Sequence, residues 1–225
     1  MLPRFLVPDL DPNRPSAVLP AEEAHHLARV LRLKAGDDVC VFDGRGREFL
    51  ARVATIAREG VVVTLLEPSD TTRAASVALT LVQAVLKGEA MDDVVRDGTM
   101  IGVATIQPVV SDRTTVKASV LPKAVERWRR IALASAKQCG RATLPRIMEP
   151  VAFASWIDAD IRGDAFLLVE PSVATSSTVT VRALAHGPAP KSASLVVGPE
   201  GGWTQEEVSL ALAAGCTSLS LGRLT

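Results

Sequence analysis

One segment of the chain combines an apolar strand, a glycine-rich loop and a helix start, an arrangement that can build a ligand site. It reads Leu195-Val196-Val197-Gly198-Pro199-Glu200-Gly201-Gly202-Trp203-Thr204. Three glycines in five residues permit positive φ angles and a close approach of the backbone to a ligand. Thr204 and Glu207 form a T-x-x-E capping box, which predicts where the helix begins. The loop is neither a P-loop nor a G-x-G-x-x-G dinucleotide fingerprint.

Glu200 inside this loop indicates which ligand charge the loop favours. A carboxylate there repels a phosphate placed at the helix N-terminus. We therefore expect a ligand that is neutral or cationic near its centre; the alternative is a tight turn whose glycines only satisfy geometry. Glu170-Pro171-Ser172 and Leu221-Gly222-Arg223 follow two other strands. Three such loops converging on one ligand would form a pocket that is recognised mainly through backbone groups.

Basic residues are concentrated in one stretch, although the net charge of the chain is zero. Lys123–Arg146 carries seven basic residues and one acid, Glu126. His25, Arg29 and Arg32 share one helix face by their i, i+4, i+7 spacing, with Arg4 in the same part of the chain. Both features suit phosphate contacts that position RNA, and both also suit a plain solvated surface.

The elements before residue 70 read as short strands with one helix. The helix is expected at Ala21–Leu33, with Ala24, Leu27, Val30 and Leu31 as its apolar stripe and Gly36 near its end. Strands are expected at Asp38–Phe42, Phe49–Ile56 and Gly60–Leu66, with Asp43-Gly44 as a hairpin turn. We interpret residues 1–70 as a small β-barrel-like domain, followed by the linker Pro68–Ala75.

From Ser76 onward strands alternate with helices, which predicts a parallel sheet covered by helices. Ligands in such sheets bind beyond the carboxyl ends of the strands. The expected strands are Val77–Val85, Ala104–Val110, Phe166–Val169, Ser194–Val197 and Ser218–Leu221. The expected helices are Ala90–Ile101, Pro122–Cys139 and Thr204–Ala214.

Composition excludes several classes of protein. Hydrophobic residues make up 48% of the 225 residues and charged residues 22%, which is typical of a globular protein. The chain has no apolar run of membrane-helix length, no signal-peptide pattern and no CxxC pair among its three cysteines. We therefore expect a cytoplasmic protein with no membrane segment and no metal. Paired carboxylates of the glycosidase type and a Ser-His-Asp set are not apparent.

Motifs along nearly the whole chain resemble the RsmE family of ribosomal RNA small-subunit methyltransferases, within the SPOUT superfamily. The most specific is Val197–Trp203 followed by Glu206-Glu207-Val208. The others are Pro3-Arg4-Phe5, His25–Arg32, Phe42-Asp43-Gly44, Gln83–Asp92 and Gln138-Cys139-Gly140-Arg141 with Pro145. Together these motifs are specific, whereas one glycine-rich loop is not.

The resemblance implies an α/β fold: a SPOUT-type trefoil-knotted parallel sheet with helices on both faces at 76–225, preceded by a PUA-like RNA-binding β-barrel domain at 1–70. It implies methylation of N3 of a uridine in 16S ribosomal RNA, with S-adenosyl-L-methionine as cofactor and a homodimer as the assembly. The Ala-rich stretch Val208–Ala214 is one candidate contributor to the dimer interface. The cofactor residues carried over are Glu170, Pro171, Gly198, Pro199, Glu200, Gly201, Gly202, Ser220, Leu221, Gly222 and Arg223.

Removal of the uridine N3 proton calls for a base, or for a cation that stabilises the uridinate. Glu89 and Glu200 are the candidate bases, and Arg141 is the candidate cation. The candidate RNA-binding residues are Arg4, His25, Arg29, Arg32, Arg127, Arg130 and Lys137.

The resemblance also predicts a truncated C-terminus. The family continues past the last strand through an Arg-Thr-Glu-Thr-Ala stretch and a helix, whereas this sequence stops at Thr225. On that basis we expect the third cofactor loop to be incomplete and the cofactor to bind weakly. Two rival functions stay open: a non-catalytic RNA-binding accessory protein with an incomplete cofactor pocket, and a metabolic α/β enzyme that binds a nucleotide. Calorimetry with S-adenosylmethionine and with RNA separates the three.

Overall fold

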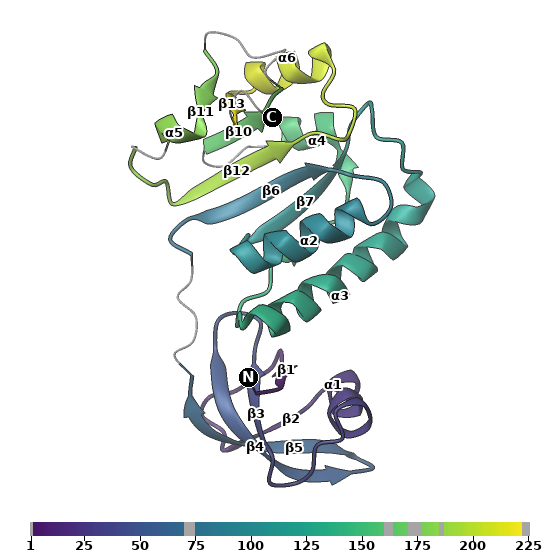
Figure 1. The fold of residues 1–225 in the computed structure, drawn as a ribbon, viewed down its shortest axis with the longest axis vertical. Coiled ribbons are helices and arrows are strands. Elements are labelled where there is room, and N and C mark those ends of the chain that lie inside the picture. The colour runs from purple at the N-terminus through teal and green to yellow at the C-terminus, as the bar shows by residue number, and fades with distance from the viewer. Residues whose placement is uncertain (1, 70–74, 160–163, 171–176, 185–186, 222–225) are drawn as a thin grey trace. The chain divides into compact units, whose positions relative to one another are not determined.

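The structure is a computed structural model that describes residues 2–69, 75–159, 164–170, 177–184 and 187–221. The chain forms two compact units, one of Met1–Ala74 with Leu133–Leu144 and one of Ala75–Ala132 with Pro145–Thr225. Most of the expected linker Pro68–Ala75 lies outside the described residues. Figure 1 shows the strands and helices of each unit.

The first unit is built on a five-stranded sheet in the order β1-β3-β4-β5-β2. Its strands are β1 (Arg4–Leu6), β2 (Ser16–Val18), β3 (Asp38–Phe42), β4 (Glu48–Ala57) and β5 (Gly60–Pro68). The pair β1–β3 is parallel and the other pairs are antiparallel. The Asp43-Gly44 hairpin turn is confirmed, since the Asp43 carboxylate accepts the amides of Arg45 and Arg47 at 2.7 and 3.0 Å.

The expected helix at Ala21–Leu33 is shorter than predicted and changes its geometry. It consists of α1 (Ala21–His25) and a π-helical turn, η1 (His26–Val30). The Leu31 amide donates to the His26 carbonyl, five residues back, so the turn is wider than the α-helix on which the predicted stripe was based. Leu27 is buried as expected, whereas Val30 is 61% exposed and Leu31 41% exposed, so that part of the predicted stripe is wrong.

The second unit contains an eight-stranded sheet in which every strand pair is parallel, as the alternating pattern predicted. The order is β11-β13-β10-β12-β6-β7-β8, and β9 pairs with β7. The strands are β6 (Ala78–Ala84), β7 (Thr105–Val110), β8 (Arg146–Ile147), β9 (Val151–Ala152), β10 (Asp164–Leu168), β11 (Val179–Thr180), β12 (Ser192–Val197) and β13 (Thr217–Ser220).

Helices cover both faces of this sheet, because successive side chains of a strand point to opposite sides. On one face, α2 (Ala90–Ile101) and α3 (Leu121–Cys139) pack through side chains such as Met91 and Trp128. On the other face, α4 (Phe153–Asp158) and α6 (Gln205–Ala213) pack against Val82 and Val196. Two short helices, η2 (Ala118–Val120) and α5 (Val181–Leu184), complete the described elements. The knot implied by the resemblance stays a prediction.

Candidate functional site

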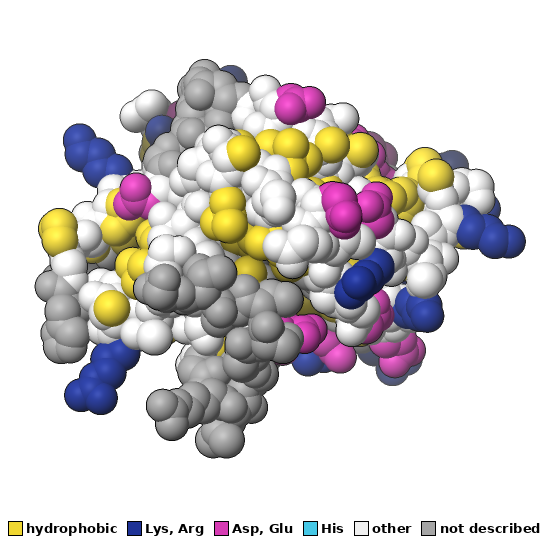
Figure 2. All heavy atoms as spheres, turned by 90° about the horizontal axis from the view of Figure 1, so that it is seen from above, with side chains coloured by type: hydrophobic (Ala, Val, Ile, Leu, Met, Phe, Trp, Pro, Cys, Tyr) yellow, Lys and Arg dark blue, Asp and Glu magenta, His cyan; other side chains and the backbone are white. Residues whose placement is uncertain are grey.

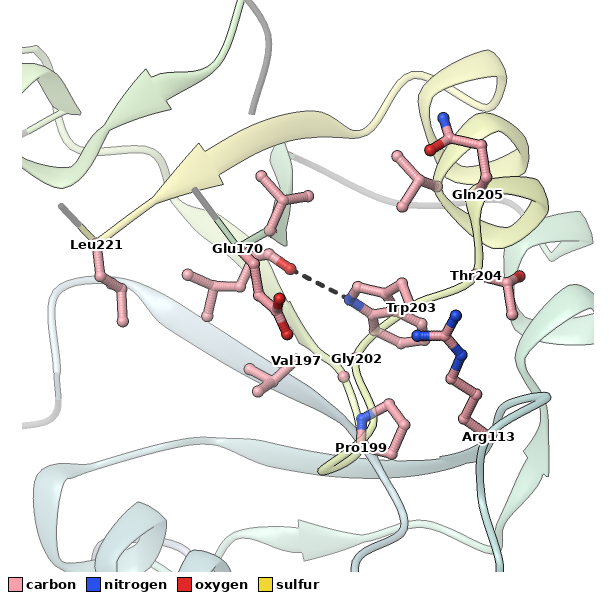
Figure 3. Close-up of a pocket in the computed structure, with 13 residues that line it drawn as sticks. Arg113, Glu170, Val197, Pro199, Gly202, Trp203, Thr204, Gln205 and Leu221 are labelled. Carbon is pink, nitrogen blue, oxygen red and sulfur yellow. Dashed lines mark hydrogen bonds between the residues drawn. The ribbon is translucent and has the colours of Figure 1, made fainter. Parts of the chain in front are cut away.

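A pocket of about 500 Å³ lies in the second unit where β10, β12 and β13 end. This is the edge of the sheet at which the strand-end loops were expected to meet. The volume is within the range of small-molecule sites. The lining residues are Arg113, Leu168, Val169, Glu170, Val197, Gly198, Pro199, Gly202, Trp203, Thr204, Gln205, Val208 and Leu221 (Figure 3).

Two of the three glycines of the loop, Gly198 and Gly202, have little room for a side chain. Gly202 has a φ of +70°, and its amide donates to the Pro199 carbonyl at 2.9 Å. A Cβ on Gly202 would lie 2.9 Å from Oε1 of Glu170, which is closer than real Cβ contacts. A Cβ on Gly198 would lie 3.2 Å from the Trp203 indole. At these two positions the backbone lies close to other side chains of the chain, and the close approach to a ligand stays a prediction.

Trp203 connects two of the strand-end segments. Its indole Nε1 donates to the Leu168 carbonyl at 3.2 Å, as the dashed line in Figure 3 shows. Its ring centroid lies 4.5 Å from that of Phe153 on α4. The indole thus holds the loop after β12 against the end of β10 and against the core of the sheet.

The predicted capping box is present and reaches further than the sequence indicates. Thr204 Oγ1 accepts the Glu207 amide at 3.2 Å, and Glu207 Oε2 accepts the Thr204 amide at 2.9 Å. The other oxygen of Glu207 accepts the amide of Asp112 at 2.9 Å. This one buried carboxylate therefore joins the glycine-rich loop to the turn that follows β7.

Glu200 is held at the outer side of the loop and is not among the lining residues. Its Oε1 accepts the Lys87 amide at 2.9 Å, and this hydrogen bond, with one to its own backbone, holds the pKa of the Glu200 carboxyl below its ordinary value. On the inner side, Gln83 donates to the Gly198 carbonyl at 3.1 Å. Among the described residues, the acid that lines the pocket is Glu170.

The structure brings together five of the expected cofactor residues at the pocket wall: Glu170, Gly198, Pro199, Gly202 and Leu221. Gly201 belongs to the same loop but does not line the pocket, and Ser220 is buried at the end of β13. Pro171, Gly222 and Arg223 lie outside the described residues.

Arg113 lines the pocket and was missed by sequence reasoning. It sits in the turn after β7, and its Nη1 donates to the Gly201 carbonyl at 2.6 Å. No motif marks it. The available signal was its position shortly after a buried strand whose carboxyl end reaches the same edge of the sheet.

The candidate catalytic residues are spread over both units. Glu89 is exposed and directly precedes α2, a few residues from the Lys87 amide that holds Glu200. Arg141 belongs to the first unit, where its Nη2 donates to Thr143 Oγ1 at 2.9 Å. Its Nε is buried, and the described residues provide no hydrogen-bond acceptor for it.

The candidate RNA-binding residues differ in how accessible their charges are. His25, Arg29 and Arg32 are exposed, although Arg32 lies past the helix end with a φ of +55°. Arg4 is buried, pairs with Glu48 and stacks on Phe42 at 5.2 Å.

The remaining three candidates belong to the basic helix α3. Lys137 is bound by both carboxylate oxygens of Glu23, at 2.6 and 2.7 Å. Arg127 pairs with Asp92 of α2, and Arg130 is exposed. The basic stretch is therefore partly neutralised by acids from distant parts of the chain.

Within the described part of the chain, no group of three or more His, Cys, Asp or Glu side chains could hold a metal ion. Over the same residues, no helix is long and apolar enough to cross a membrane.

Residues 73–225 match the family model of an RNA methyltransferase domain, and residues 19–66 match that of an RNA methyltransferase PUA domain. The chain is 32% identical over 208 residues to ribosomal RNA small subunit methyltransferase E of Synechocystis sp., covering 92% of this chain and 67% of that protein. A protein of the same name from Buchnera aphidicola is 25% identical over 224 residues, covering 98% and 86%.

Two solved structures are similar over nearly the whole chain. One is ribosomal RNA small subunit methyltransferase E from Neisseria gonorrhoeae bound to S-adenosyl methionine, with a TM-score of 0.86 at 27% identity, covering 99% of this chain and 90% of that one. The other is a putative methyltransferase from Legionella pneumophila in complex with the same cofactor, with a TM-score of 0.86 at 28% identity and the same coverage.

Proposed function

This chain belongs to the ribosomal RNA small subunit methyltransferase E family, and from that premise we propose that it transfers a methyl group from S-adenosyl-L-methionine to N3 of a uridine in 16S ribosomal RNA. The observation that carries the proposal is the pocket at the ends of β10, β12 and β13. A glycine-rich loop and an acid line it, at the edge where a parallel sheet binds ligands.

The pocket residues fit this cofactor in size and charge. Gly198 and Gly202 leave room where side chains would collide with Trp203 and Glu170. The carboxylate of Glu170 favours a ligand that carries positive charge, and this cofactor does. The bound cofactor supplies an activated methyl group, so the main tasks of the protein are to orient the uridine and to exclude water. We assign cofactor binding to Glu170, Gly198, Pro199, Gly202 and Leu221.

The proton on uridine N3 must be removed for the methyl group to be accepted. The lowered pKa of Glu200 makes that carboxylate a weak base, because it stays ionised down to low pH. Glu89 is an exposed carboxylate that directly precedes α2, and we assign removal of the proton to it. Arg141 stays the candidate cation for stabilising negative charge on the ring oxygens, because a guanidinium keeps its positive charge at neutral pH.

We assign RNA docking to the exposed surface formed by His25, Arg29 and Arg32, with Arg130 as a second contact. Arg4, Arg127 and Lys137 are left out of this surface because acids already pair with them. Replacing Arg29 and Arg32 by Ala should weaken RNA binding and reduce the slope of log affinity against log salt by about two. An unchanged slope would count against the assignment.

The proposal includes a homodimer, a trefoil knot and a cytoplasmic location, as the family implies. The homodimer is supported by apolar side chains left exposed on α6, which lies on the face shown in Figure 2: Leu210 is 38% exposed and Leu212 40%. Val208 and Ala211 of the same helix are buried inside the unit, so only the outer half of the stretch Val208–Ala214 is free for an interface. A monomer in sedimentation at micromolar concentration would remove the dimer.

The test of the function is methyl transfer from radiolabelled S-adenosylmethionine to free 16S RNA and to assembled small subunits. Nucleoside mass spectrometry of the product should find N3-methyluridine at one position. The Glu89→Gln variant should lose most of the rate at neutral pH. Glu206→Gln serves as the matched control, because Glu206 is also exposed and lies outside the pocket wall. No transferred methyl in either RNA would refute the function, and a methyl on another atom would refute the N3 assignment.

A further inference from the structure

Two charged side chains lie among the described residues that line the pocket, and they carry opposite charges. Glu170 follows β10, and Arg113 lies in the turn after β7. Figure 3 shows them on either side of the loop that carries Gly202. From the point that a Cβ on Gly202 would occupy, Glu170 Oε1 is 2.9 Å away and Arg113 Nη1 is 4.0 Å away.

Arg113 and Glu170 are not joined by any of the salt bridges in the described part of the chain. Arg113 is held in place instead by the loop. Its Cβ and Cδ pack 3.5 and 3.4 Å from where a Cβ on Gly201 would be, and its Nη1 donates to the Gly201 carbonyl. One hydrogen bond occupies one of the five guanidinium donors, which leaves others available to a ligand.

We propose that Arg113 and Glu170 bind the α-carboxylate and the α-ammonium group of an amino acid, the methionine end of S-adenosylmethionine, across Gly202. The inference rests on the proposed function and adds to it the placement of one end of the cofactor. An amino-acid zwitterion carries the two opposite charges on one carbon, which matches a carboxylate and a guanidinium on either side of a residue without a side chain. The apolar wall formed by Leu168, Val197 and Leu221 remains for the uncharged part of the ligand.

This assignment makes Arg113 a residue that recognises the cofactor's carboxylate. A guanidinium binds a carboxylate through two parallel hydrogen bonds, and charge-assisted hydrogen bonds are about twice as strong as neutral ones. The loss of one such contact, worth about 1.5–3 kcal/mol, corresponds to a roughly 10- to 100-fold weaker affinity.

The test compares two ligands that differ only in the amino-acid part. S-adenosylhomocysteine carries the zwitterion, and 5′-methylthioadenosine lacks it. Calorimetry on the full chain should show that Arg113→Met weakens S-adenosylhomocysteine binding about 10- to 100-fold and leaves 5′-methylthioadenosine unchanged. Met keeps an unbranched stem over Gly201, so the loop stays covered. Glu170→Gln should give the same ligand-selective loss through the ammonium group.

Arg182→Met and Glu206→Gln are the matched controls, since both residues are exposed and neither lines the pocket. Equal S-adenosylhomocysteine affinity in wild type and Arg113→Met overturns the inference, and so does a parallel loss of both ligands, which indicates a structural role. A loss of RNA affinity alone would assign Arg113 to a phosphate and also overturn it. If the wild type binds neither S-adenosylmethionine nor S-adenosylhomocysteine, the proposed function fails together with the inference.

Discussion

Replacing Glu207 by Gln should destabilise the site more than the same change at the neighbouring Glu206. Glu207 is 6% exposed, and its carboxylate accepts two backbone amides, those of Thr204 and Asp112, each at 2.9 Å. A Gln side chain has a single acceptor oxygen, so its NH₂ group would face one of these N–H groups and leave it unpaired. A buried donor without a partner costs about 1–3 kcal/mol.

A cost of about 2 kcal/mol corresponds to a fall in Tm of about 4–8 °C for a chain of this size. Glu206→Gln is the matched control, because Glu206 is exposed in the same first turn and loses only its interaction with the helix dipole. Its expected effect is at most about 1 kcal/mol. Differential scanning calorimetry measures both variants.

Hydrogen exchange provides the local measurement. The amides of Thr204 and Asp112 should exchange faster in Glu207→Gln and normally in Glu206→Gln. Because Glu207 holds the glycine-rich loop to the turn that carries Arg113, cofactor affinity should fall in the Glu207 variant alone. Equal stability and equal exchange in the two variants would refute the view that this carboxylate joins the two walls of the pocket.

Three further outcomes are expected. Gly202→Ala should weaken cofactor binding, because its Cβ would meet Glu170. Gly215→Ala is the control: Gly215 also has a positive φ but has open space around it, so this variant should lose about 1–2 kcal/mol of stability and keep its cofactor affinity. Equal cofactor affinity of the two variants in calorimetry would contradict this prediction. The folded-state pKa of Glu200 is lowered, so the stabilisation that its carboxylate provides is present above about pH 4.3 and is lost as the pH falls through the folded pKa. The free energies of unfolding of wild type and Glu200→Gln should therefore converge in acid. A difference between them that stays constant with pH would contradict the contact with the Lys87 amide. Gln83→Met should leave the Gly198 carbonyl without its donor and lower the free energy of unfolding by about 1–2 kcal/mol. Urea unfolding measures this, and an unchanged midpoint would contradict the prediction.

Local pattern determined much of the fold. The strand Asp38–Phe42 and the helix Ala90–Ile101 have the predicted bounds, because hydrophobic periodicity and turn residues are local signals. The Thr204–Glu207 box was also predictable, since both partners lie within one turn. The short elements β8, β9, β11 and α4 were missed because runs of two to six residues carry too little periodicity to identify.

Partners far apart in the chain were decided by the tertiary structure alone. The sequence shows a basic helix, yet packing pairs Lys137 with Glu23 and Arg127 with Asp92, which removes part of the charge that appeared free for RNA. It shows an acid in the glycine-rich loop, yet the backbone amide of Lys87 turns Glu200 outward. The strand-end loops, the T-x-x-E box and the need for glycine follow from local rules of backbone geometry. Which charged side chains face the pocket depends on contacts between strands that are distant in sequence, and no spacing rule encodes them.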